Sequence, residues 1–99
     1  MVKHIVFWQF KASAAGQTKQ YNMDQVKRQL EALNGLPGVI TLEVGFDILN
    51  VGASCDVALY SAFENQAALE AYQEHPDHVV VKEFLGEVTK DRYVVDYVL

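Results

Sequence analysis

The first stretch of the chain is apolar on both of the sides that a strand would present. In residues 2–11, His4 and Trp8 point to one side of an extended backbone, while Ile5 and Phe7 point to the other. β-Branched and aromatic residues dominate this stretch, which favours a strand. A strand that is apolar on both sides must be covered twice, once by helices and once by a second surface.

The rest of the chain predicts three more strands and three helices. Stretches rich in β-branched and aromatic residues predict strands over residues 39–49, 55–61 and 92–99, the first two joined as a hairpin. Apolar residues at helical spacing predict helices over residues 19–33, 64–75 and 76–88. Pro76 separates the last two helices, because the residue before a proline is pushed out of the helical region. The run 79–81 leaves a strand open as an alternative there, and Gly45 is expected to mark a bulge or a close backbone approach.

The order of these elements, β-α-β-β-α-α-β, matches the ferredoxin-like arrangement. We therefore expect a single α+β domain over residues 1–99, a four-stranded antiparallel sheet with the helices on one face. Of the 99 residues, 51% are apolar, which is more than the core of so small a domain hides. A second copy of the chain is expected to cover the bare sheet face, so the protein is predicted to be a homodimer.

Charge and cysteine content narrow the choice of partners and compartment. Thirteen acidic residues against eight basic ones give a net charge of −5, which argues against nucleic acid. No stretch approaches the roughly twenty apolar residues that span a membrane, so no membrane is expected either. The single Cys55 cannot form an intramolecular disulfide, which fits a cytoplasmic protein. No glycine-rich nucleotide motif and no nucleophile elbow is present, and no cofactor is predicted.

Five motifs follow one another along the chain. They are VKHIVFWQFK at the start, LEVGFD, SCDVAL, YQEHPDH and the terminal VVDY. Together they resemble the stress-responsive A/B barrel family, also called dimeric α/β barrel (Dabb) proteins, over nearly the whole chain. The most specific part of the resemblance is the HPDH junction, residues 75–78, in combination with His4.

The resemblance implies a homodimer in which the sheets of two chains pack face to face as a dimeric α/β barrel, with the helices outside. The family includes plant stress proteins without an assigned reaction and small bacterial proteins. It also includes a plant polyketide cyclase of the olivetolic acid type, which closes a linear chain by aldol condensation. Similarity to such a family predicts the fold and the dimer more strongly than the chemistry.

The helix junction carries the candidates for catalysis. Tyr72 lies one helical turn before His75, and His78 follows three residues later, so the three side chains could meet near one cavity. An imidazole can take a proton from a carbon beside a carbonyl, and a phenol can donate a hydrogen bond to the enolate oxygen. In the cyclase, a Tyr and the second His of H-P-x-H fill these roles, which the resemblance assigns to Tyr72 and His78. The alternative is that His78 packs the junction and Tyr72 is a core aromatic residue, with His75 in the turn.

An interior cleft is expected to accept a small apolar or aromatic molecule. The residues predicted to line it, beside Tyr72 and His78, are His4, Phe7, Trp8, Phe10, Tyr60 and Phe84. His4 is expected either to orient a ligand oxygen or His78, or to be a hydrogen-bonded core residue. The spacing of His75 and His78, with Asp77 between them, also suggests a metal site. A metal site normally needs three or four ligands and the signal is weak, so no metal is predicted.

Two acidic residues lie inside predicted strands, where a charge needs a partner. They are Asp56 and Asp96. Structural ion pairs with Arg92, Lys3 or Lys11 at the rim of the barrel are expected.

Three hypotheses about function arise from these residues. The first is a cytoplasmic homodimeric barrel that binds a small apolar or aromatic ligand. The second is a cofactor-independent cyclase or lyase that uses His78 as base and Tyr72 as oxyanion donor. The third, a cofactor-free monooxygenase, rests on the related fold alone. A purely structural dimer without a ligand is the simplest alternative.

Overall fold

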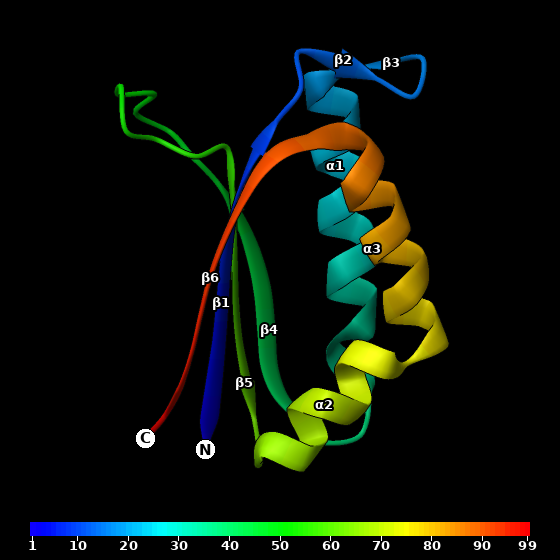
Figure 1. Cartoon of the computed structure of the whole chain (residues 1–99), viewed down its shortest axis with the longest axis vertical. Coiled ribbons are helices and arrows are strands. Elements are labelled where there is room, and N and C mark those ends of the chain that lie inside the picture. Colours follow the sequence, from blue (N-terminus) through cyan, green and yellow to red (C-terminus); the bar gives the residue numbers. More distant parts are fainter.

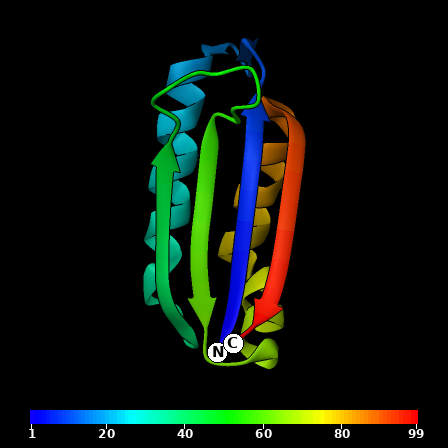
Figure 2. The same cartoon turned by 90° about the vertical axis from the view of Figure 1, so that its left-hand side faces the viewer.

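Four strands form the main sheet of the computed structural model, which describes residues 1–99. They are β1 (Val2–Phe10), β4 (Val39–Phe46), β5 (Val57–Phe63) and β6 (Thr89–Val98). Neighbouring strands are antiparallel, and their order across the sheet is β4-β5-β1-β6 (Figure 2). The central strands are therefore the first and the third of the four, as in a ferredoxin-like fold. The predicted α+β fold is confirmed.

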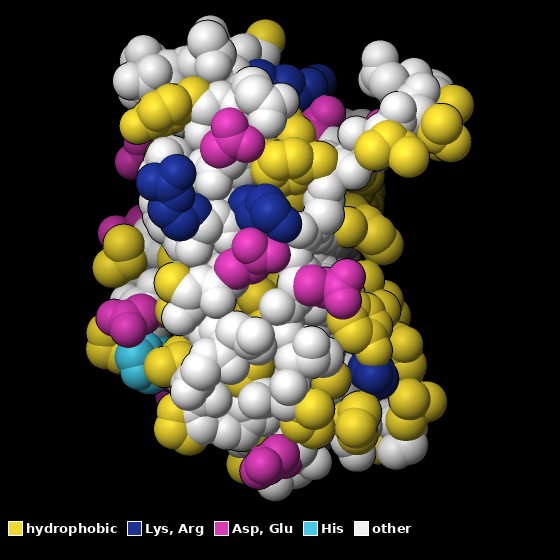
Figure 3. Space-filling model, turned by 180° about the vertical axis from the view of Figure 1, so that it is seen from behind, with side chains coloured by type: hydrophobic (Ala, Val, Ile, Leu, Met, Phe, Trp, Pro, Cys, Tyr) yellow, Lys and Arg dark blue, Asp and Glu magenta, His cyan; other side chains and the backbone are white.

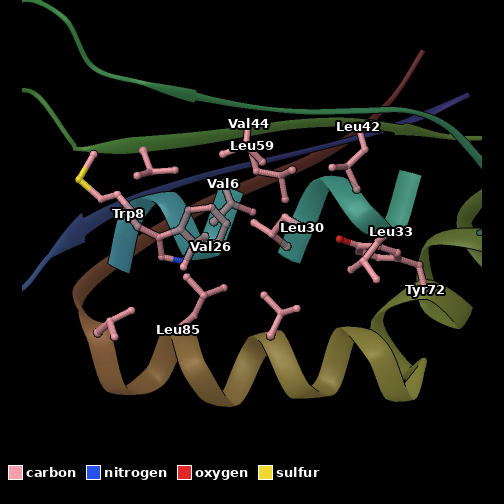
Figure 4. Close-up of a cluster of buried hydrophobic side chains, with 14 of the residues drawn as sticks. Val6, Trp8, Val26, Leu30, Leu33, Leu42, Val44, Leu59, Tyr72 and Leu85 are labelled. Carbon is pink, nitrogen blue, oxygen red and sulfur yellow. The ribbon is translucent and has the colours of Figure 1, made fainter. Parts of the chain in front are cut away.

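Three α-helices cover one face of the sheet and leave the other face open (Figure 1). They are α1 (Lys19–Glu31), α2 (Gln66–Glu74) and α3 (Pro76–Val88), and a short 3-10 helix, η1 (Ala32–Gly35), follows α1. Alternate residues of β1, beginning with Val2, are buried on the helix side. The core lies between these two layers, where Val6 of β1, Leu30 of α1 and Leu85 of α3 gather (Figure 4). No helix combines the length and the apolar content that crossing a membrane requires.

Local side-chain caps explain where the helices begin. The Thr18 hydroxyl accepts a hydrogen bond from a backbone N–H in the first turn of α1, and the Asn65 side chain does the same for α2. His75 ends α2 and caps α3, because its Nδ1 accepts from the Asp77 N–H at 3.1 Å. Pro76 then occupies the first turn of α3, so the predicted break at this proline is confirmed and the run 79–81 is helical.

The hairpin between β4 and β5 differs from the prediction in two respects. Gly45 pairs regularly with Ala58, so it marks no bulge, and no other part of the chain lies within 4 Å of the place that its Cβ would take. The strand predicted over 39–49 already ends at Phe46. The Asp47 carboxylate turns the chain there by accepting from the Asn50 N–H at 2.7 Å.

A small second sheet was not expected from the sequence. It consists of β2 (Ser13–Ala14) and β3 (Gln17–Thr18), which form a hairpin before α1. Ala15 and Gly16 at its tip both have positive φ, 52° and 73°, as a tight hairpin turn requires. Strands of two residues carry too few side chains to give a readable alternation.

The open face of the sheet carries a broad apolar surface. Phe7 is 40% exposed there, its cross-strand neighbour Tyr93 is 54% exposed, and Val95 continues the surface along β6. The loop 47–56 rises on the same side of the sheet (Figure 1). Its exposed apolar side chains are Ile48, Leu49 and Val51. Figure 3 shows apolar side chains along this side of the molecule and on the loop that overhangs it.

Candidate functional site

A cavity of about 430 Å³ opens on the helix side of the sheet, next to β6. This volume is within the usual range of small-molecule sites. The cavity is lined by His4, Val6, Trp8, Leu30, Leu59, Gln73, His78, Lys82, Leu85, Gly86, Thr89 and Arg92. It exists because the helices leave this edge of the sheet uncovered: Val94 pairs with Val6 on the helix side and is still 46% exposed. Figure 4 shows Val6 and Trp8 of β1 beside Leu85 of α3.

His4 belongs to the wall that β1 contributes, and it is only 3% exposed. Antiparallel pairing places Asp96 of β6 directly opposite, and the His4 Nδ1 is hydrogen-bonded to the Asp96 carboxylate. An ionised carboxylate can only accept, so Nδ1 carries a proton and Nε2 is left for another contact. His4 is therefore a hydrogen-bonded buried residue, one of the two roles expected for it, and it also lines the cavity.

His78 lies in the first turn of α3 and is 8% exposed. Its Nδ1 lies 3.2 Å from the Gln73 carbonyl oxygen, so this nitrogen must be the donor and Nε2 is the free acceptor. Burial lowers the pKa of His78 below its usual value, and the hydrogen bond to Gln73 partly opposes this shift. The nearby charges of Lys82, His4 and Arg92 lower the pKa of this imidazole further. A neutral imidazole with a free Nε2 is the form that can accept a proton.

Tyr72 lies in the last turn of α2 and is 2% exposed. Its ring centroid is 4.4 Å from that of His78 and 5.0 Å from that of Phe63, so it packs directly against the imidazole. The Tyr72 hydroxyl has no hydrogen-bond partner, and burial raises its pKa, which keeps the phenol protonated. The hydroxyl points into the layer between the sheet and the helices (Figure 4), but Tyr72 does not line the cavity.

The aromatic residues predicted to line one cleft lie in three different places. His4 and Trp8 line the cavity together with His78. Phe10 is buried in the core, and Phe84 is half-buried and packs against the core. Phe7 and Tyr60 pair with residues on the open face instead, because successive residues of a strand point to opposite sides of the sheet. The predicted grouping therefore combined residues that the sheet separates.

The ion pairs predicted for the strand carboxylates have other partners in the structure. Asp56 pairs with Lys19 at 3.1 Å, and it also accepts from the Phe10 backbone N–H at 2.7 Å. Asp96 pairs with His4. The predicted partners Arg92, Lys3 and Lys11 bind neither carboxylate. The predicted partners were wrong because cross-strand register places His4 opposite Asp96 and the position of α1 brings Lys19 to Asp56, and the sequence contains neither arrangement.

Five polar or small residues that line the cavity were not predicted as site residues. They are Gln73, Lys82, Gly86, Thr89 and Arg92. Asp96 does not line the cavity and reaches the site through its hydrogen bond to His4. The helical spacing offered a partial indication, because His78, Lys82 and Gly86 follow one another at intervals of four and therefore share one side of α3. No group of three or more His, Cys, Asp and Glu side chains is arranged to hold a metal ion, and His75 and Asp77 form an exposed pair at 3.9 Å.

Fold and cavity together define a class of protein: a ferredoxin-like α+β domain with a histidine-containing cavity on the helix side of its sheet. The model of the stress responsive A/B barrel domain matches residues 2–99. The chain therefore belongs to the stress-responsive A/B barrel family, as its motifs predicted.

Solved structures resemble the chain over nearly its full length. A dimeric protein of unknown function with a ferredoxin-like fold from Bacteroides fragilis is 34% identical, with a TM-score of 0.84, over 97% of this chain and 93% of that one. A dimeric ferredoxin-like protein of unknown function from Thermobifida fusca is 22% identical, with a TM-score of 0.85, over 99% and 90% of the two chains. A hydroxynitrile lyase from Passiflora edulis is 23% identical, with a TM-score of 0.80, over 99% and 92%. The search of curated proteins found no match.

Proposed function

We propose that this protein is a homodimer that binds a small apolar or aromatic molecule in the cavity beside His4 and His78. The observation that carries the proposal is a preformed cavity of about 430 Å³ lined by two buried histidines, each with its Nδ1 hydrogen-bonded and its Nε2 without a partner in the chain. Its apolar walls would bury the body of the ligand, and the imidazoles would orient a polar group on it. The unpaired Cys55 fits a cytoplasmic location.

A glycine in the wall of the cavity, Gly86, supports the proposal that the cavity is open to a ligand. It lies inside α3, where glycine destabilises a helix by roughly 0.5–1 kcal/mol relative to alanine. No close neighbour requires it, because nothing lies within 4 Å of the place that a Cβ would take. The missing side chain leaves free space in the lining of the cavity instead.

The apolar open face supports association through the sheet. An uncovered surface that includes Phe7, Tyr93 and Val95 favours burial against a partner. The relatives from Bacteroides fragilis and Thermobifida fusca are dimeric, which supports a second copy of this chain as that partner. The cavity lies on the other side of the sheet, so a dimer of this kind would leave it accessible.

The experiment that tests the cavity uses N-phenyl-1-naphthylamine, a neutral aromatic probe whose fluorescence rises in apolar sites. We expect wild type to bind it and Gly86→Leu to bind it at least about tenfold more weakly, because the leucine side chain fills the cavity. Glu87→Leu is the matched control, since it adds the same side chain at an exposed neighbouring position of α3 that does not line the cavity. Equal binding by wild type and Gly86→Leu, or no binding by wild type, would overturn the proposal.

A cofactor-independent lyase or cyclase is the second candidate. Two observations favour it: burial lowers the pKa of His78, whose Nε2 is free to accept a proton, and the Tyr72 hydroxyl has no hydrogen-bond partner. Tyr72 packs behind His78 and does not line the cavity, so its hydroxyl would reach a ligand oxygen only if the ligand enters beyond the lining residues. The resemblance to a hydroxynitrile lyase adds support at the level of fold.

The lyase candidate predicts turnover of a linear poly-β-keto thioester. His78→Gln is expected to lower the rate about a hundredfold or more, the usual contribution of a general base. Tyr72→Phe keeps the ring that packs on His78 and removes only the hydroxyl, so a comparable loss would assign the effect to the hydroxyl. Equal rates in wild type and both variants would eliminate this candidate.

A further inference from the structure

The charge of the cavity differs in sign from that of the whole chain. Its twelve lining residues include Lys82 and Arg92 and no carboxylate, whereas the protein has a net charge of −5. Neither Lys82 nor Arg92 makes an ion pair or a side-chain hydrogen bond within the chain. The Asp96 carboxylate, on the strand beside the cavity, is hydrogen-bonded to His4.

These two cations come from opposite walls of the cavity. Lys82 lies one helical turn after His78 on α3, on the side of the helix that faces the cavity. Arg92 lies on β6 directly opposite Trp8, on the side of the sheet that the helices face. The charges of both residues act on His78, since each lowers its pKa in addition to the larger effect of burial. A ligand beside Trp8 and His78 would therefore contact a positive charge from each wall.

We propose that the ligand of this cavity carries an anionic group, such as a carboxylate, attached to an apolar or aromatic body, and that Lys82 and Arg92 bind this group. The inference rests on the proposed function, because it requires that the cavity binds a ligand. Lys82 and Arg92 are exposed at the mouth of the cavity, and two unpaired cations beside its apolar walls can give an anion charge-assisted hydrogen bonds. They also form a positive region on an acidic protein, which attracts anions from solution.

The test compares two probes that differ by one charged group. The anionic probe is 8-anilinonaphthalene-1-sulfonate, and the neutral one is N-phenyl-1-naphthylamine, which has the same rings without the sulfonate. Wild type is expected to bind the anionic probe about tenfold more tightly, and added salt is expected to reduce this preference. Lys82→Gln and Arg92→Gln are each expected to lower the affinity for the anionic probe about five- to tenfold. Their affinity for the neutral probe should stay within about twofold of the wild-type value.

Two control variants remove the same charges elsewhere. Lys90→Gln lies on the same strand as Arg92, and Arg28→Gln lies on α1; both residues are exposed and neither lines the cavity. Both controls are expected to bind the two probes as wild type does. Equal losses for both probes in Lys82→Gln and Arg92→Gln, or an equal loss of the anionic probe in the controls, would overturn the anion proposal.

The two proposals fail in distinguishable ways. Suppose that wild type binds the neutral probe, that Gly86→Leu blocks this binding, and that wild type binds the anionic probe no more tightly. The cavity then binds ligands, and only the anion preference is wrong. If Gly86→Leu blocks neither probe, binding occurs outside the cavity and both proposals are wrong.

Discussion

His78 shows how burial sets the chemistry of a single residue. The imidazole lies in a helix turn, its Nδ1 is held by the Gln73 carbonyl, and burial together with nearby cations lowers its pKa. The tautomer follows from the hydrogen bond, and the neutral state follows from the surroundings. Both properties suit a base or an acceptor that faces a ligand. A histidine in a solvated turn has neither of them imposed on it.

The lowered pKa of His78 predicts a pH dependence of stability. The unfolded chain binds this proton near the usual histidine value of about 6.5, and the folded chain binds it only at lower pH. Between these two pH values the unfolded state holds more protons, so the free energy of unfolding falls as the pH falls, and the loss is complete below the folded pKa. In His78→Asn, whose amide can still donate to Gln73, this part of the pH dependence should disappear.

Urea unfolding of wild type and His78→Asn at several pH values between 7.5 and 5 measures this difference. An NMR titration of the His78 ring gives the folded pKa directly and should place it below the usual value. Identical pH profiles for the two proteins, or a ring that titrates above the usual value, would contradict the assignment.

The edge of the sheet decides where the cavity lies. Helix α1 lies behind β4 and helix α3 behind the β1 and β6 side of the sheet (Figure 2), but β6 is left largely uncovered, and its residues from Lys90 onward are exposed. The gap between α3 and β6 is therefore available to a ligand, and register places Asp96 behind His4 and Arg92 opposite Trp8. The junction between α2 and α3 contributes the other wall, because the turn at His75 and Pro76 redirects the chain and brings His78 inward.

The elements themselves were largely predictable from local patterns. The break at Pro76 follows from the shape of the proline ring, and the two-sided apolar character of β1 is visible in its residues. The termini of the strands were less predictable: β4 ends three residues early because the Asp47 side chain turns the chain. Such side-chain to backbone bonds compete with strand pairing, and their outcome depends on the surrounding loop.

At the scale of the whole molecule, the sheet separates two surfaces of different character. The helix side holds the core and the cavity, and the open side carries the exposed apolar surface around Phe7 and Tyr93. Because the two surfaces are on opposite faces, association and ligand binding can be perturbed independently.

A substitution on the open face is expected to dissociate the dimer. Phe7→Lys places a charge on a central strand of this face, and in a symmetric dimer it does so twice, so the dissociation constant should rise about a hundredfold or more. Val80→Lys is the control, because Val80 is 62% exposed on α3 and lies on the helix side. Sedimentation at micromolar concentration measures the association state of both variants and of wild type.

The expected result is a dimer for wild type and Val80→Lys and a folded monomer for Phe7→Lys, with circular dichroism unchanged. A wild-type particle of 11.1 kDa at these concentrations would show that the open face is not an interface between copies.

Periodicity and composition were sufficient for the order of the elements, the ferredoxin-like fold and an apolar surface left uncovered, because these depend on the spacing of residues along one segment at a time. They were also sufficient to mark His4, Tyr72 and His78 as residues of interest. Which side chains meet was decided only by tertiary structure. The pairing of His4 with Asp96 and the placing of Lys82 and Arg92 in one cavity depend on register and layer packing, which join residues far apart in the chain.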